Sequence, residues 1–196
     1  MDLNEIKDFW ESKYRNGQTG WDIGAISQPL KDYIDQLKNK NIDILIPGAG
    51  RAYEAEYLLD RGFLNVNVLD IAEEPLDELK KRVPHFQKEQ LHCENFFSHT
   101  KQYDLILEQT FFCAIDPVLR ENYVKKSHAL LKSNGKMAGL LFDFPLTEEG
   151  PPFGGSLEHY MDLFEPYFHL NVLDRSYNSI KPRLGRELFF IFEKKN

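Results

Sequence analysis

The chain lacks several features that would narrow its class at once. Among 196 residues there are two cysteines, Cys93 and Cys113, and they form no C-x-x-C pair of the kind found in zinc sites or disulfide frameworks. No apolar run approaches the roughly 20 residues that cross a bilayer, and the charged N-terminus does not resemble a signal peptide. We therefore expect reduced thiols, no membrane partner and a cytoplasmic location.

Positive charge is also scarce, with 24 lysines and arginines against 31 acidic residues and a net charge of −7. Nucleic-acid binders usually concentrate basic residues on one face, so we expect a small-molecule partner and no nucleic acid. No long apolar patch is evident, which favours a monomer. We predict no metal site, because the histidines lack the i, i+4 spacing of metal ligands; they are His85, His92, His99, His128, His159 and His169.

Short apolar runs alternate with helix-like segments along most of the chain. The predicted buried strands are Ile42–Pro47, Val66–Ile71, Leu91–Phe96, Tyr103–Glu108 and Lys136–Phe144. The predicted helices are Gln28–Lys38, Ala52–Arg61, Glu74–Arg82, Pro117–Leu131 and Ser156–Phe164. This alternation is typical of a parallel sheet with helices on both faces.

The pattern changes after the Gly150-Pro151-Pro152 turn. Two strand-like runs follow, Phe168–Arg175 and Glu187–Glu193, with no helix-like segment between them. Such strands are expected to pair antiparallel. No linker composition divides the chain, so we predict one α/β domain.

A glycine-containing turn follows the first predicted strand. Gly48 and Gly50 allow a tight turn with close backbone approach to a ligand, and the helix that follows offers free N–H groups. In open parallel sheets, ligands bind at the carboxyl ends of the strands. Asp70 ends the next strand, 22 residues after Gly48, where a carboxylate can accept hydrogen bonds from ribose hydroxyls. Together these residues indicate a cofactor that contains adenosine.

A dinucleotide-binding turn would carry a third glycine where this chain has Tyr53. That difference favours a cofactor without phosphates, such as S-adenosylmethionine. From these residues alone two alternatives stay open: an NAD-dependent oxidoreductase on a similar sheet, and an ordinary strand-to-helix turn with an incidental aspartate.

Six segments, which together cover nearly the whole chain, occur in the same order as in one known protein family and are more specific than the glycine turn. They are FWESKYRNGQTGWDIGAISQPL, LIPGAGRAYEAEYLLDRG, VLDIAEEPL, EQTFFCAIDPVLRENY, GPPF and SIKPRLGRELF. With them the chain resembles the thiopurine methyltransferase-like family of S-adenosylmethionine-dependent methyltransferases, and within it the halide and thiol methyltransferases. The resemblance implies a Rossmann-like class I methyltransferase fold. Its mostly parallel seven-stranded sheet has an antiparallel C-terminal strand, in a single domain over 1–196 whose residues 1–40 form a cofactor lid.

The resemblance also assigns a cofactor-binding set. An N-terminal aromatic lid closes over the methionine part of the cofactor, where aromatic faces attract the sulfonium cation by roughly 0.5–2 kcal/mol. Tyr14 departs from the tryptophan that is common in the family. The implied residues are given in the order lid, glycine loop, ribose pair, adenine site and end of the fourth strand. They are Trp10, Tyr14 and Trp21; Gly48 and Gly50; Asp70 and Ile71; Asn95 and Phe96; and Gln109.

The acceptor side is expected at the end of the fourth strand. Gln109 stands where halide and thiol methyltransferases often have a tyrosine, which leaves the choice of nucleophile open. Arg186 is expected to attract an anion to an apolar pocket. The expected pocket residues are Gln109, Phe111, Phe112, Cys113, Phe153 and Arg186.

The expected reaction is an in-line displacement by a small soft nucleophile: a thiol, thiopurine, bisulfide or halide. An anionic acceptor needs no general base, and we find no Ser-His-Asp set in the sequence. The departures at Tyr14 and Gln109 leave a third alternative, a protein that binds S-adenosylmethionine without catalysis.

Overall fold

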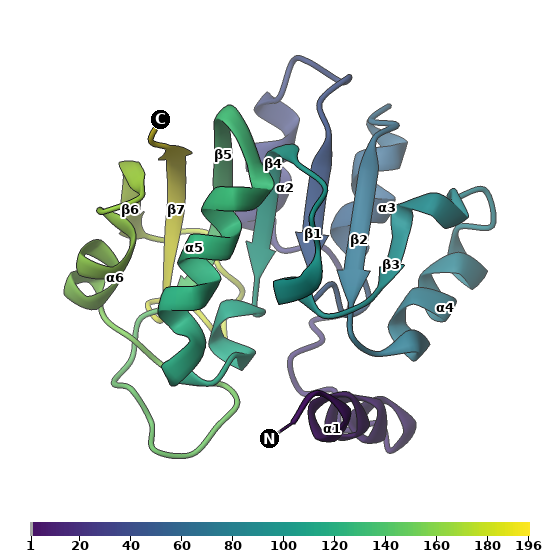
Figure 1. Ribbon diagram of the computed structural model, residues 1–196, viewed down its shortest axis with the longest axis horizontal. Coiled ribbons are helices and arrows are strands. Elements are labelled where there is room, and N and C mark those ends of the chain that lie inside the picture. The colour runs from purple at the N-terminus through teal and green to yellow at the C-terminus, as the bar shows by residue number, and fades with distance from the viewer. Residues whose placement is uncertain (1) are drawn as a thin grey trace.

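Seven strands form one sheet at the centre of the computed structural model, which describes residues 2–196 (Figure 1). The strand order is β3-β2-β1-β4-β5-β7-β6. All neighbours from β3 to β5 pair in parallel, whereas β7 pairs antiparallel with both β5 and β6. The strands are β1 (Ile44–Pro47), β2 (Val66–Asp70), β3 (Leu91–Cys93), β4 (Tyr103–Gln109), β5 (Leu131–Phe142), β6 (Phe168–Arg175) and β7 (Glu187–Lys194).

Helices cover both faces of the sheet (Figure 1). One face carries α2 (Gln28–Gln36), α3 (Tyr53–Asp60) and α4 (Glu73–Arg82), and the other carries α5 (Arg120–Leu130) and α6 (Leu157–Phe164). The first helix, α1 (Leu3–Arg15), lies beyond the carboxyl ends of β1 and β2 and contacts α4. Short 3₁₀ turns occur at Lys88–Gln90, Phe96–Ser98, Phe112–Ala114 and Pro117–Leu119.

Strand β1 shows why the apolar runs are strands. Ile44 and Ile46 face the core under α2 and α3, while Leu45 faces the second core under α5 and α6. Because both faces are covered, every residue of β1 is apolar rather than every second one. The predicted parallel sheet, its helices on both faces and the antiparallel pairing of the last two strands are confirmed.

Several predicted boundaries were wrong. The third strand ends at Cys93, and Phe96 begins a 3₁₀ turn in which Asn95 Oδ1 accepts the Phe97 N–H at 3.0 Å. The helix predicted to start at Pro117 begins as a 3₁₀ turn and becomes α5 only at Arg120. Strand β5 starts at Leu131 rather than Lys136, because Leu131 already pairs with Tyr103 across a β-bulge.

Helix α1 was missed in the sequence. Its start carries a capping box: Asp2 Oδ1 accepts the Glu5 N–H at 2.9 Å, and Glu5 Oε2 accepts the Asp2 N–H at 2.7 Å. The D-x-x-E spacing was therefore the available signal. None of its residues is fully buried. No helix among residues 2–196 has both the length and the apolar character that a membrane span requires.

Candidate active site

The loop after β1 has a backbone that side chains rarely adopt. Gly48, Gly50 and Ala52 have positive φ angles of 55°, 52° and 53°. A Cβ atom at Gly48 would lie 2.1 Å from Cδ2 of Phe111, which belongs to the loop after β4. The first glycine is therefore required both by its conformation and by the close approach of these two loops.

Asp70 ends β2 beside this loop and is buried. Its carboxylate accepts the Ala72 N–H at 2.9 Å and the Gly50 N–H at 3.3 Å. Burial raises the pKa of Asp70 to about 6, against the opposing effect of these backbone donors. The structure thus brings together Gly50 and Asp70, with Ile71 next in the chain.

The three predicted lid aromatics form one cluster over the glycine loop. A Cβ at Gly50 would lie 3.6 Å from Trp21 Nε1 and 3.7 Å from the Tyr14 hydroxyl. The Trp21 ring makes edge-to-face contacts with Trp10 at 5.4 Å and Tyr14 at 5.6 Å between centroids. Burial, with the nearby Asp70 charge, raises the pKa of Tyr14, so its hydroxyl stays protonated.

Hydrogen bonds connect the lid segment to the glycine loop, to the start of α3 and to the C-terminal turn. Asp22 accepts from the Tyr53 hydroxyl at 3.1 Å and from Arg51 Nε at 3.3 Å. From the C-terminal turn, Arg183 Nη2 donates to the Trp21 carbonyl at 2.8 Å.

An open cleft lies between the lid segment and the glycine loop. Its lining includes Trp21, Gly48, Glu54, Gln109 and Thr110. Gln109 Oε1 accepts the Ser27 hydroxyl at 2.5 Å, so this side chain is held against the segment after the lid. A second, smaller cavity is also lined by Thr110, which therefore borders both spaces.

Glu54 is a site residue that the sequence analysis missed. It is the second residue of α3 and is 7% exposed. Among residues 2–196, no other residue donates a hydrogen bond to its carboxylate, and burial raises its pKa to about 7. Acidic residues are common in first helical turns, so the sequence could not show that this one faces a cleft. A buried carboxylate there provides a site for a cationic group.

The loop after β4 is organised by another buried acid, Glu108. Its carboxylate accepts the Phe111 N–H at 2.8 Å, the Phe112 N–H at 2.9 Å and the Tyr123 hydroxyl at 2.5 Å. Burial raises the pKa of Glu108 to about 7 despite these donors. Thr110 adopts a φ of 60° within this loop, a conformation that β-branched residues rarely adopt and that is concentrated at functional sites.

Two of the predicted pocket residues, Phe112 and Cys113, are buried. Phe112 is 1% exposed and packs against Tyr123 and Tyr160 in the core. Cys113 is buried, which raises the pKa of its thiol, and its carbonyl accepts the Phe153 N–H at 2.8 Å.

The C-terminal turn carries two arginines, Arg183 and Arg186, and neither belongs to the lining of the two cavities. Arg186 is exposed, with its guanidinium 4.8 Å above the Phe144 ring, outside the lining of both cavities. The side chain of Arg183 is 11% exposed, and its charge favours the thiolate form of Cys113.

The predicted adenine residues follow β3. Asn95 caps the 3₁₀ turn with its side-chain oxygen. Phe96 is 2% exposed and stacks on Tyr123, with 5.2 Å between ring centroids. Its ring therefore belongs to the core under α5.

Comparison with known proteins decides the family. A family model described as "Thiopurine S-methyltransferase (TPMT)" matches residues 5–194. The chain belongs to this family. It is therefore an S-adenosylmethionine-dependent methyltransferase acting on a thiol-type nucleophile, and the oxidoreductase alternative is set aside.

Curated relatives agree with this assignment. "Probable thiol methyltransferase 2" of Arabidopsis thaliana is 26% identical over 184 residues, covering 91% of this chain and 81% of the relative. "Thiocyanate methyltransferase 1" of Brassica oleracea is 26% identical over 193 residues, covering 95% and 85%. A thiopurine S-methyltransferase of Marinobacter nauticus is 23% identical, covering 86% of each chain.

Solved structures confirm the class I methyltransferase fold. The 1,6-didemethyltoxoflavin-N1-methyltransferase of Burkholderia thailandensis, solved with S-adenosylhomocysteine, matches with a TM-score of 0.77 at 20% identity, covering 100% of this chain and 92% of that one. A TehB-like methyltransferase of Corynebacterium glutamicum matches with a TM-score of 0.64 at 18% identity, covering 98% and 100%.

The buried Glu54 carboxylate, to which no other residue of 2–196 donates a hydrogen bond, should lower the stability of the cofactor-free methyltransferase. Because its pKa rises on folding, the protonated form is favoured, and the stability it supports is lost as pH rises from about 4.5 through about 7. Glu54→Gln should therefore raise the free energy of unfolding at pH 8 by roughly 1–3 kcal/mol and leave it nearly unchanged at pH 4. Urea unfolding at the two pH values measures this.

Glu158→Gln is the matched control, since Glu158 is also the second residue of its helix but is exposed. It should change stability little at either pH. Equal destabilisation of Glu54→Gln at both pH values would show that Glu54 is a structural residue.

Proposed function

We propose that this methyltransferase acts on small anionic sulfur nucleophiles, such as bisulfide, thiocyanate and small thiolates, with halide ions as weaker acceptors. The observation that carries the proposal is the shared wall at Thr110. The larger cleft, between the lid and the glycine loop, suits the cofactor by its position, and the much smaller cavity beyond Thr110 favours an acceptor of a few atoms. A thiopurine ring would need more room than this cavity offers.

The glycine loop and Trp21, which line the larger cleft, and the polar and aromatic residues next to them would hold S-adenosylmethionine. In our proposal Asp70 accepts hydrogen bonds from the ribose, Ile71 and Asn95 border the adenine, and the loop at Gly48 and Gly50 lies along the methionine part. The cluster of Trp10, Tyr14 and Trp21 faces the sulfonium, as its position over Gly50 supports. When bound, the cofactor supplies a methyl group activated by a positively charged sulfur.

Glu54 completes the cofactor site in this proposal. The methionine part carries an ammonium group, and the cleft offers one buried carboxylate that no other described side chain satisfies. Pairing with the ammonium would relieve the desolvation cost that raises the Glu54 pKa.

On the acceptor side, the protein positions and desolvates the nucleophile. Leu140, Leu141 and Phe142 give the small cavity apolar walls. Glu187 also lines it, and the Arg183 guanidinium lies 3.4 Å from the Glu187 carboxylate, which offsets that negative charge. An acceptor that is already an anion needs no proton transfer, and good positioning lowers the barrier by about 7–11 kcal/mol in favourable cases. The buried Cys113 thiol serves as part of the wall.

A panel of acceptors tests the proposed substrate class. With labelled S-adenosylmethionine, bisulfide, thiocyanate and a small alkyl thiol should give methylated product with higher kcat/KM than iodide, and a thiopurine should react least. Because bulk decides the order, Leu140→Ala should raise the relative rate with the thiopurine. Reaction with the thiopurine alone would overturn the size argument, and no product from any acceptor would favour binding without catalysis.

The lid aromatics should distinguish the cofactor from its demethylated product. Trp21→Leu removes an aromatic face from the proposed sulfonium site, and a cation–π contact of about 0.5–2 kcal/mol corresponds to roughly 2–30-fold in affinity. The affinity of the variant for S-adenosylmethionine should fall by that factor. Its affinity for S-adenosylhomocysteine, which has no positive charge on sulfur, should fall by less. Calorimetry gives both values. Equal losses would mean that Trp21 acts only by packing; Tyr177→Leu, at an 87% exposed position, is the control.

The Glu54 carboxylate should contribute to binding of either ligand, since both carry the ammonium group. At pH 8 we expect Glu54→Gln to weaken S-adenosylhomocysteine about 10-fold or more, because a charged hydrogen bond is worth about 1.5–3 kcal/mol. Glu158→Gln should bind as the unmodified protein does. Unchanged affinity in Glu54→Gln would contradict the ammonium role.

A further inference from the structure

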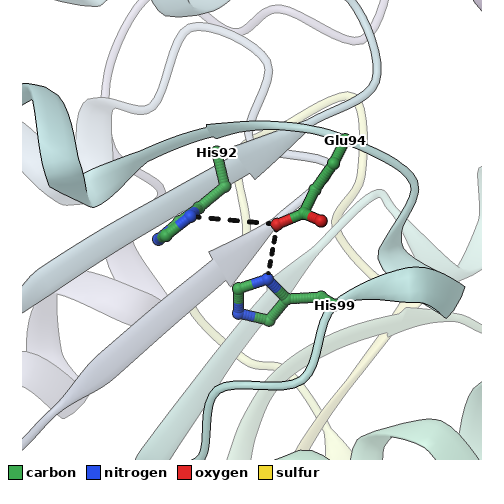
Figure 2. A group of neighbouring side chains, drawn as sticks. All are labelled: His92, Glu94 and His99. Carbon is green, nitrogen blue, oxygen red and sulfur yellow. Dashed lines mark hydrogen bonds and ion pairs between the residues drawn. The ribbon is translucent and has the colours of Figure 1, made fainter.

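Three side chains outside the cofactor cleft converge at the edge of the sheet. His92 lies in β3, Glu94 follows that strand, and His99 precedes β4 (Figure 2). One ligand atom from each lies within 4.8 Å of the others. The spacing H-x-E-x₄-H does not place the three side chains on one face of a helix or strand. They come together because the chain turns over residues 94–98.

The two imidazole rings are oriented in the same way. His99 Nε2 lies 2.6 Å from the Tyr103 hydroxyl, and His92 Nε2 lies 3.1 Å from Asn67 Oδ1. Both Nδ1 atoms then face Glu94 Oε1, at 2.8 Å from His99 and 3.9 Å from His92 (Figure 2). Histidines that bind metals usually direct their second ring nitrogen to a protein oxygen, which fixes the ring and its tautomer. The outer partners of such a site are thus already in place.

The separations suit a tetrahedral ion. Zinc–nitrogen and zinc–oxygen distances of about 2.0–2.1 Å give a ligand-to-ligand edge of about 3.3 Å. The two measured separations from Glu94 Oε1, 2.8 and 3.9 Å, lie on either side of that edge. All three ligand atoms lie within 4.8 Å of one another, so metal binding in our proposal requires the His92 ring and the carboxylate to move closer to the ideal edge.

We propose that His92, Glu94 and His99 bind a zinc-class divalent transition metal ion through two Nδ1 atoms and one carboxylate oxygen. Imidazole and carboxylate are ligands that such ions accept, and a solvent molecule completes the fourth position. In this proposal the single N–H of the neutral His99 ring moves from Nδ1, where it faces Glu94, to Nε2 when the metal binds, and Nε2–H then donates to the Tyr103 hydroxyl oxygen. The ion would join the end of β3 to the start of β4.

Neighbouring groups set limits on the site. Lys101 Nζ donates to Asn67 Oδ1 at 3.0 Å, so a positive charge lies behind His92 and lowers the affinity. Cys93 occupies the position between His92 and Glu94, and its thiol lies toward the Ile71 carbonyl at 3.8 Å instead. The proposed ligand set therefore excludes sulfur.

Titration of the chelator-treated, full-length protein with Co²⁺ tests the site. We expect one equivalent to bind with the intense visible absorption of tetrahedral cobalt and without a thiolate charge-transfer band. Zn²⁺ should displace it and raise Tm. His92→Gln and Glu94→Gln should each weaken binding by at least 10-fold, and Tyr103→Phe by about 10-fold through loss of the outer partner.

His85→Gln, at an exposed position, controls for adventitious binding, and Cys93→Ser controls for the thiol. Circular dichroism confirms that each variant folds. Absence of cobalt absorption and of a zinc-induced Tm shift would show that these residues form only a Glu94–His99–Tyr103 hydrogen-bond chain. Binding that persists in Glu94→Gln or disappears in Cys93→Ser would also overturn the proposed ligand set.

Discussion

The close approach of Gly48 to the Phe111 ring is the constraint on which the site depends. These residues follow β1 and β4, which are neighbours in the sheet, and no room is left for even one carbon atom between their loops. Glu108 supports the contact from the interior by accepting the N–H groups of Phe111 and Phe112. With both loops fixed, the glycine turn lies under the lid and Thr110 lies between the two cavities.

Three buried acids near this contact experience different surroundings. Asp70 and Glu108 accept backbone N–H groups, so part of the cost of burying each carboxylate is offset within the chain. Glu54 accepts no hydrogen bond from any other residue in the part of the chain that the structure describes. The buried Glu54 carboxylate lowers the stability of the folded protein, yet it lies beside a cleft. This arrangement is expected where ligand binding and protein stability favour different residues.

The sheet could be predicted from the sequence because its strands are buried on both faces, and continuous apolar runs such as Ile44–Pro47 record that burial directly. The glycine turn and Asp70 could be predicted because their backbone positions follow from the order of strands. What the sequence could not show is the direction in which a side chain points. Arg183 and Arg186 lie in the same turn, yet only Arg183 reaches the lid. The grouping of His92 with His99 likewise depends on a turn that was read as strand.

The attachment of the N-terminal segment bears on turnover. Helix α1 contributes no fully buried residue to either core. The segment after it accepts side-chain hydrogen bonds from Arg51, Tyr53 and Arg183, and its Ser27 hydroxyl donates to Gln109. Opening the segment would break these hydrogen bonds and expose the rings of Trp10, Tyr14 and Trp21, but it would leave both cores beside the sheet packed. Where a lid must open for each exchange of cofactor, the cost of exposing such rings enters the rate of product release, which limits turnover in many enzymes.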